Sequence, residues 1–102
     1  MVRITKSVAE KRLSDVSHEK QFWCHDGHYL KNLQELEAAL EQMTEETFRY
    51  HVNETKSDFS NWVRDVIGDD KLSRDLRKSA TRAQAAKSVA KRIVLLNTKI
   101  EN

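Results

Sequence analysis

This chain contains no proline and only two glycines, Gly27 and Gly68, among its 102 residues. Because these two residue types shape the turns of strand-rich folds and interrupt helices, their scarcity favours compact helices whose ends are set by capping side chains. A single cysteine excludes an internal disulfide. The sequence also lacks an apolar run long enough for a signal peptide or a membrane span, so we expect a cytoplasmic protein with no membrane contact.

The length is that of one domain with a modest core, and one third of the residues are charged. The net charge of +2 conceals a segregation along the chain. Residues 21–70 hold four basic and eleven acidic side chains, a net charge of −7, whereas residues 71–102 hold nine basic and two acidic, a net charge of +7. Such asymmetry indicates either a surface for an anionic partner or attraction between the two halves of the domain.

The stretch from residue 48 to 72 contains a complete helix with both of its ends. Ser57 or Asp58 is expected to cap the first turn, and Gly68 is expected to end the helix in the left-handed conformation. The apolar residues between these ends recur at i, i+3, i+4 and i+7, which places them on one buried face: Phe59, Trp62, Val63 and Val66.

A hairpin is predicted around Asp26-Gly27, a pair suited to the centre of a type I′ turn. The resulting register pairs residue 25 with 28, 23 with 30, and 22 with 31. Trp23 and Leu30 would then share one side of the ribbon, and Cys24 and Tyr29 the other. Because an isolated hairpin is barely stable in water, one of these sides must pack on helices.

Capping residues predict the remaining helices, which start after Asn32, Thr44, Asp69 or Asp70, and Thr81. The last of them is the longest, and its buried positions are Ala86, Val89, Ile93, Leu96 and Ile100. Residues 1–20 show weak periodicity and are interpreted as a flexible arm or a marginal helix. We therefore predict a mostly α fold in residues 21–102, with a small N-terminal β-hairpin packed on a compact bundle of four to five helices and a long basic C-terminal helix.

Five short segments follow one another in a distinctive order: F-x3-DG from residue 22, NLxEL from 32, FxxHVN from 48, KxDFxxWV from 56 and DVxGD from 65. This order resembles a short prokaryotic domain family of unknown function that is frequent in archaea, over residues 22 to 78. Ser57 and Ser73 depart from the pattern, in which asparagine and alanine are expected. The resemblance implies a small helical module led by a hairpin, and it implies no catalytic activity.

Residue types that often hold metals or act as nucleophiles occur at Cys24, His25 and His28. Structural zinc sites usually combine two pairs of ligands, whereas the predicted hairpin turns Cys24 away from the two histidines. Cys24 also lacks a positive cluster that would lower its pKa and activate the thiol. We therefore expect no metal, no cofactor, no small-molecule substrate and no enzymatic activity.

A polar cluster is expected where the short connection after residue 52 folds back toward the central helix. Its members are His51, Asn53, Lys56 and Asp58. As a binding site, these side chains would hold a small anion or a peptide terminus. As an ordinary helix-to-helix turn, His51 and Asn53 would instead bond to the backbone, and Lys56 would pair with Asp58.

Two binding functions fit the sequence. The first is a non-catalytic interaction module that docks on a protein partner or on itself, through the aromatic hairpin or through Val94 and Leu95, which fall outside the buried stripe of the last helix. The second is a small protein that binds RNA or DNA without sequence specificity. Its candidate contacts are the basic residues Arg74, Arg77, Lys78, Arg82, Lys87, Lys91 and Arg92.

Overall fold

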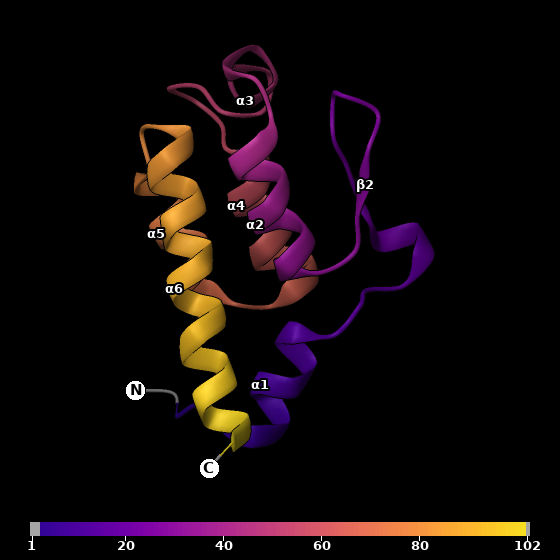
Figure 1. Cartoon of the computed structure of the whole chain (residues 1–102), viewed down its shortest axis with the longest axis vertical. Coiled ribbons are helices and arrows are strands. Elements are labelled where there is room, and N and C mark those ends of the chain that lie inside the picture. Colours follow the sequence, from indigo (N-terminus) through magenta and orange to yellow (C-terminus); the bar gives the residue numbers. More distant parts are fainter. Residues whose placement is uncertain (1–2, 102) are drawn as a thin grey trace.

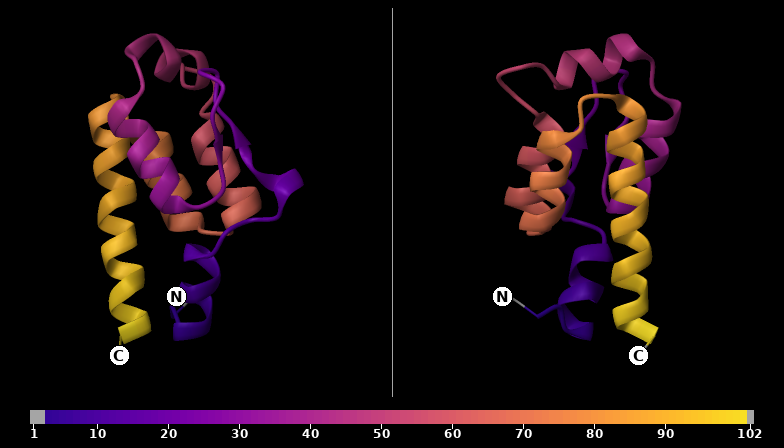
Figure 2. Two further views of the ribbon diagram at one scale, coloured as in Figure 1. Left: turned by 45° about the vertical axis from the view of Figure 1, so that its right-hand side comes forward. Right: turned by 90° about the vertical axis from the view of Figure 1, so that its left-hand side faces the viewer.

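The computed structural model describes residues 3–101 and confirms a mostly helical fold with a small hairpin and a long C-terminal helix (Figure 1). The helices surround one core, and the longest of them, α6, runs along the length of the molecule (Figure 2). The elements in order are α1 (Lys6–Leu13), η1 (His18–Lys20), β1 (Phe22–Trp23), β2 (Tyr29–Leu30), α2 (Leu33–Gln42), α3 (Glu45–His51), α4 (Asp58–Trp62), η2 (Val63–Ile67), α5 (Asp70–Lys78) and α6 (Arg82–Glu101).

The central helix begins and ends as its sequence predicts. The Ser57 hydroxyl accepts a hydrogen bond from the Ser60 amide at 3.3 Å, and Gly68 has a left-handed φ of 85°. Between these ends, the last turn widens into the π-helix η2, in which the Gly68 amide donates to the Val63 carbonyl. Phe59, Trp62 and Val63 are buried, which confirms that both aromatic rings face the core.

The other predicted helix starts are also confirmed. Asn32, Thr44 and Thr81 each accept a hydrogen bond from an amide in the first turn that follows them. Of the two candidates before α5, Asp69 is the cap, because its carboxylate accepts from the Leu72 amide. The large apolar side chains of these helices form one core with the hairpin: Leu33, Leu36, Leu40, Phe48, Phe59, Leu72, Val89 and Leu96 are all essentially inaccessible to solvent.

The predicted register of the hairpin is wrong by one residue. Phe22 pairs with Leu30 and Trp23 with Tyr29, because the loop has three residues rather than two. The Cys24 carbonyl accepts from the Gly27 amide at 2.8 Å, and Gly27 takes the left-handed conformation as the third loop residue. Since a shift of one residue exchanges the two faces of a strand, Phe22, Cys24 and Leu30 now face the core, while Trp23 and Tyr29 face outward.

The N-terminal segment is not the flexible arm that one of our two interpretations expected. Its first two residues lie outside the described part of the chain, but Lys6–Leu13 form α1, capped by Thr5 and packed along α6 (Figures 1 and 2). The sequence pattern is weak because the contact uses a small residue, Ala9, which is fully buried, and the half-buried Leu13. A short side chain lets two helices approach closely without an apolar stripe.

A buried ion pair joins three helices beneath this contact. The Asp69 carboxylate, which has no exposed surface, accepts from Arg92 Nε at 2.7 Å and from Arg92 Nη2 at 2.9 Å, while Arg12 Nη1 lies 3.8 Å away. The carboxylate thus caps α5 and bonds to α6 while it faces α1.

None of the helices in residues 3–101 has both the length and the apolar character needed to cross a bilayer.

Candidate aromatic docking surface

Four large rings gather on the outside of the hairpin and α3. They form what we call the aromatic surface: Trp23, His25, Tyr29 and Tyr50. Trp23, Tyr29 and Tyr50 are 46%, 63% and 47% exposed, and they are three of the five large apolar side chains that the described residues leave exposed. Trp23 and Tyr29 face each other across the two strands, so their side chains lie on the same face.

The rings hold one another in fixed orientations. His25 stacks on Tyr50 with ring centres 3.9 Å apart and planes 11° from parallel. Trp23 meets both rings nearly edge-on, at 6.0 Å from His25 and 6.3 Å from Tyr50. Stacked and edge-to-face contacts are the favoured geometries for such pairs. Trp23, His25 and Tyr50 therefore support one another, which lowers the entropy cost of fixing these three rings when a partner docks.

A buried histidine supports these rings from below. His51 accepts a hydrogen bond from the His25 amide through Nε2 at 3.0 Å, and its Nδ1 lies 3.0 Å from the Asp58 carboxylate. Because Nε2 serves as an acceptor, the proton resides on Nδ1 and is donated to Asp58. The imidazole thereby ties the hairpin loop to α4, and it also contacts the core rings of Phe22 and Phe59 at 5.0 and 5.2 Å.

Three members of the predicted polar cluster meet, and the fourth does not. Lys56 Nζ lies 3.3 Å from the same Asp58 oxygen that His51 faces, and 5.4 Å from the centre of the Tyr50 ring. Asn53 instead closes its own loop by accepting from Thr55 and from the Lys56 amide at 3.1 Å. These contacts match the helix-to-helix turn of our second interpretation, in which Lys56 pairs with Asp58. The binding of a small anion or a peptide terminus by this cluster stays a prediction.

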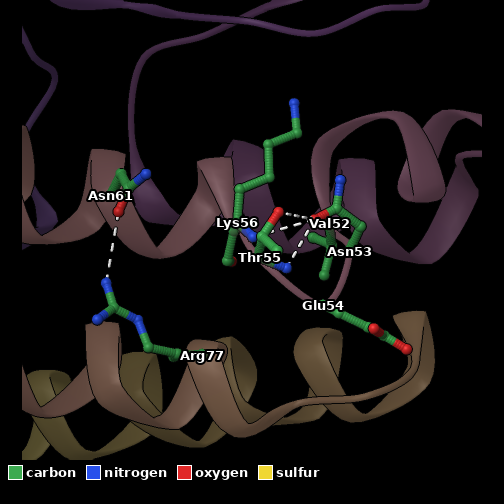
Figure 3. Close-up of a pocket in the computed structure, with 8 residues that line it drawn as sticks. Val52, Asn53, Glu54, Thr55, Lys56, Asn61 and Arg77 are labelled. Atoms are coloured by element: carbon green, nitrogen blue, oxygen red, sulfur yellow. Dashed lines mark hydrogen bonds between the residues drawn. The ribbon is translucent and has the colours of Figure 1, made fainter.

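A separate polar hollow of about 280 Å³ lies on the other side of this loop (Figure 3). The loop from Val52 to Ser57 forms one wall, while Asn61 of α4 and Arg77 of α5 form another. Arg77 donates a single long hydrogen bond, 3.4 Å, to the Asn61 side chain. The view shows Glu54 directed away from Arg77, so these two charges do not converge on a common ligand.

The seven basic candidates separate into different settings. Arg92 is bound to Asp69, and Arg82 donates to the carbonyl groups of Leu40 and Glu41 at the end of α2. Both guanidinium groups are therefore part of the fold. Arg74 is exposed on α5 and Arg77 lines the hollow of Figure 3, whereas Lys78, Lys87 and Lys91 lie together along a groove between α5 and α6.

Val94 and Leu95 lie on α6 with 65% and 38% of their surfaces exposed. They belong to the part of α6 that extends toward the C-terminal end of the molecule, away from the hairpin tip (Figure 1). They are two aliphatic side chains, whereas the aromatic surface combines four rings. Their role as a partner contact stays a prediction.

Cys24 faces the core, while His25 and His28 are exposed. Burial raises the pKa of the Cys24 thiol, which keeps the sulfur protonated and unreactive. In the hairpin loop, partial burial of Asp26 acts to raise the pKa of its carboxyl, but hydrogen bonds from His28 outweigh it and hold that pKa below its usual value. Within residues 3–101, no three metal-ligating side chains lie close enough together to hold an ion.

Comparison with known proteins found no match among protein-family models, curated proteins or solved structures. The resemblance to the archaeal domain family therefore stays a prediction. Sequence reasoning named the aromatic hairpin as a docking candidate but did not find the aromatic surface itself, because the predicted register placed Trp23 and Tyr29 on opposite sides of the ribbon. The loop composition His-Asp-Gly is also compatible with a three-residue loop, and this was the available signal for the correct register.

Proposed function

We propose that this protein is a non-catalytic interaction module that docks a protein partner through its aromatic surface. The observation that carries the proposal is the ordered arrangement of Trp23, His25 and Tyr50, with Tyr29 beside them, in a chain whose other large apolar residues are mostly buried. Tryptophan and tyrosine are the residues most enriched among those that dominate binding energy in protein interfaces.

The surroundings of the aromatic surface favour a protein partner over a polyanion. Beside it lies a shallow hollow of about 370 Å³, bordered by Gln21, Lys56, Asp58 and Trp62. Its one lysine is paired with Asp58, so the rim carries no uncompensated positive charge there. A mixed polar rim around apolar rings is the usual composition of a protein interface. The cytoplasm remains our proposed compartment.

The test is co-purification of the full chain from its native host, with and without nuclease, against Trp23→Ala and Tyr29→Ala. These side chains face solvent, so their truncation is expected to leave folding intact, whereas each lowers affinity for the identified and purified partner by tenfold or more. The matched control is Val94→Ala with Leu95→Ala, which removes exposed apolar surface elsewhere and leaves affinity unchanged.

Three results would overturn the proposal. They are a partner whose affinity is the same for wild type and both ring variants, a partner that disappears on nuclease treatment, and self-association that Trp23→Ala abolishes in light scattering with no other protein bound. The last result would identify a second copy of this chain as the occupant. Loss of affinity in the control pair alone would move the docking site to α6.

A further inference from the structure

The groove between α5 and α6 gathers three positive charges from two helices. It is lined by Lys78 of α5 and by Lys87 and Lys91 of α6, together with polar side chains of Ser79, Gln84 and Ser88 and the Asp75 carboxylate. We call this the lysine groove, and its volume is about 330 Å³. Three lysines from two different helices thus face the same space.

The three lysines lack the partners that neighbouring cations have. Among residues 3–101, no carboxylate lies within ion-pair distance of Lys78, Lys87 or Lys91. The one acid in the groove, Asp75, is already paired with Lys71 at 2.6 Å. On the same two helices, Arg82 and Arg92 each reach a carboxylate of another element.

This arrangement works against the stability of α6. Lys87 and Lys91 are one helical turn apart, and like charges at this spacing repel one another and destabilise the helix. Lys78 adds a third positive charge from the facing helix. An anion in the groove would remove this repulsion, and an anion with several charged groups would neutralise all three lysines at once.

We infer that the lysine groove binds the phosphate backbone of a nucleic acid. Lysine is a point-charge donor suited to phosphate oxygens, and the Gln84 amide and the Ser88 hydroxyl add further donors. The Ser79 hydroxyl adds none, because it donates to the Asp75 carbonyl. None of the residues that line the groove is aromatic, so the site has no platform for stacking bases and recognises the backbone without reading sequence. Arg82 and Arg92 contribute nothing to it, because both are bound within the fold.

The experiment measures the salt dependence of binding to a mixed-sequence DNA duplex and to a single-stranded RNA, using the full chain. Neutralising three phosphates predicts that the logarithm of the binding constant falls with the logarithm of salt concentration with a slope of about −2.7 for the duplex and about −2.1 for the single strand. Replacing Lys78, Lys87 and Lys91 by glutamine brings the slope close to zero. Each single replacement reduces it by about 0.9 on the duplex.

The matched control carries Lys6→Gln, Lys11→Gln and Lys20→Gln, which remove the same charge from exposed positions on and near α1. We expect this control to keep the full slope. Equal losses in both triple variants would overturn the inference, since binding would then follow net charge alone, and so would a wild-type slope that is near zero. Urea unfolding of both variants checks folding, and Trp23→Ala is expected to keep the slope, which separates this site from the proposed docking of a protein.

Discussion

Asp58 and Asp69 stand at the starts of neighbouring helices, yet their surroundings differ. Asp69 is fully buried and is neutralised by a two-pronged contact from Arg92. Asp58 is about one third exposed and shares its charge between the His51 ring and Lys56. The first carboxylate therefore fixes how α1, α5 and α6 meet, and the second holds the hairpin loop under the aromatic surface. We therefore expect the fold to depend more on the contacts of Asp69 than on those of Asp58, because Asp69 is the more deeply buried.

The difference between Asp58 and Asp69 is tested most directly by neutralising each carboxylate in turn. Asp69→Asn leaves Arg92 buried without a counter-charge, so we expect the free energy of unfolding to fall by about 3–5 kcal/mol. Asp58→Asn keeps an oxygen that can accept from His51 Nδ1 and leaves the exposed Lys56 in contact with water, so it should lower the free energy of unfolding by only about 1 kcal/mol. Urea unfolding followed by circular dichroism measures both. Equal losses would show that the degree of burial does not separate the two sites.

The second prediction concerns the histidine that joins the hairpin to α4. His51→Phe retains a ring among Phe22 and Phe59 but removes the partner of the His25 amide and one of the two partners of Asp58. We expect a loss of about 1–3 kcal/mol in the free energy of unfolding. The near-ultraviolet dichroism of Trp23 and Tyr50 should also weaken, because their ring contacts depend on the position of the loop. A variant as stable as the wild type would mean that the ring, and not its hydrogen bonds, supports the aromatic surface.

Gly68 lies on the chain between the two aspartates and offers a third test. No atom lies within 4 Å of the position of an added Cβ, so Gly68→Ala introduces backbone strain without a steric clash. A left-handed alanine costs about 1–2 kcal/mol, which thermal or urea unfolding would detect. Gly68→Asn is the control and should cost less, because asparagine tolerates this conformation. Equal costs for both variants would point to a cause other than the left-handed φ.

The prediction with the smallest expected effect concerns the rate at which Cys24 is labelled and not the free energy of unfolding. Because burial raises the pKa of Cys24 and covers its sulfur, a thiol reagent should label the native protein far more slowly than the unfolded chain. Asp58→Asn should speed native labelling, since it loosens the contact between the hairpin loop and α4. Arg12→Gln, at the other end of the molecule, should leave the rate unchanged. Equal acceleration by both variants would show that labelling reports global unfolding and not local opening of the hairpin.

Helix starts and buried stripes could be read directly from the sequence because both depend on residues a few positions apart. Ser57, Asn32 and Thr44 cap the helices that they were expected to cap, and Phe59 and Trp62 face the core. The hairpin register could not be predicted in the same way, since a loop of two residues and a loop of three residues both fit the Asp-Gly pair. The choice between them is made by Phe22, which stacks on Phe59 with ring centres 5.0 Å apart.

The basic residues show the same division. Their spacing predicted a positively charged C-terminal region, but spacing alone could not separate Arg92, bound to Asp69, from Lys91, which lies in the lysine groove. Likewise, α1 has too little apolar periodicity to be recognised as packed. The small side chain of Ala9 lets α1 approach α6 closely but buries little apolar area. Such distinctions depend on which distant element lies opposite each side chain.

By itself, the sequence determined where the helices begin and end and which of their faces are apolar, because caps and periodicity act over one or two turns. Only the tertiary structure decided which rings of the hairpin face outward and which basic side chains bond within the fold. It also decided that α1 packs against α6. The physical reason is that burial and ion pairing are set by contacts between segments twenty or more residues apart, as between Arg92 and Asp69 or His51 and His25.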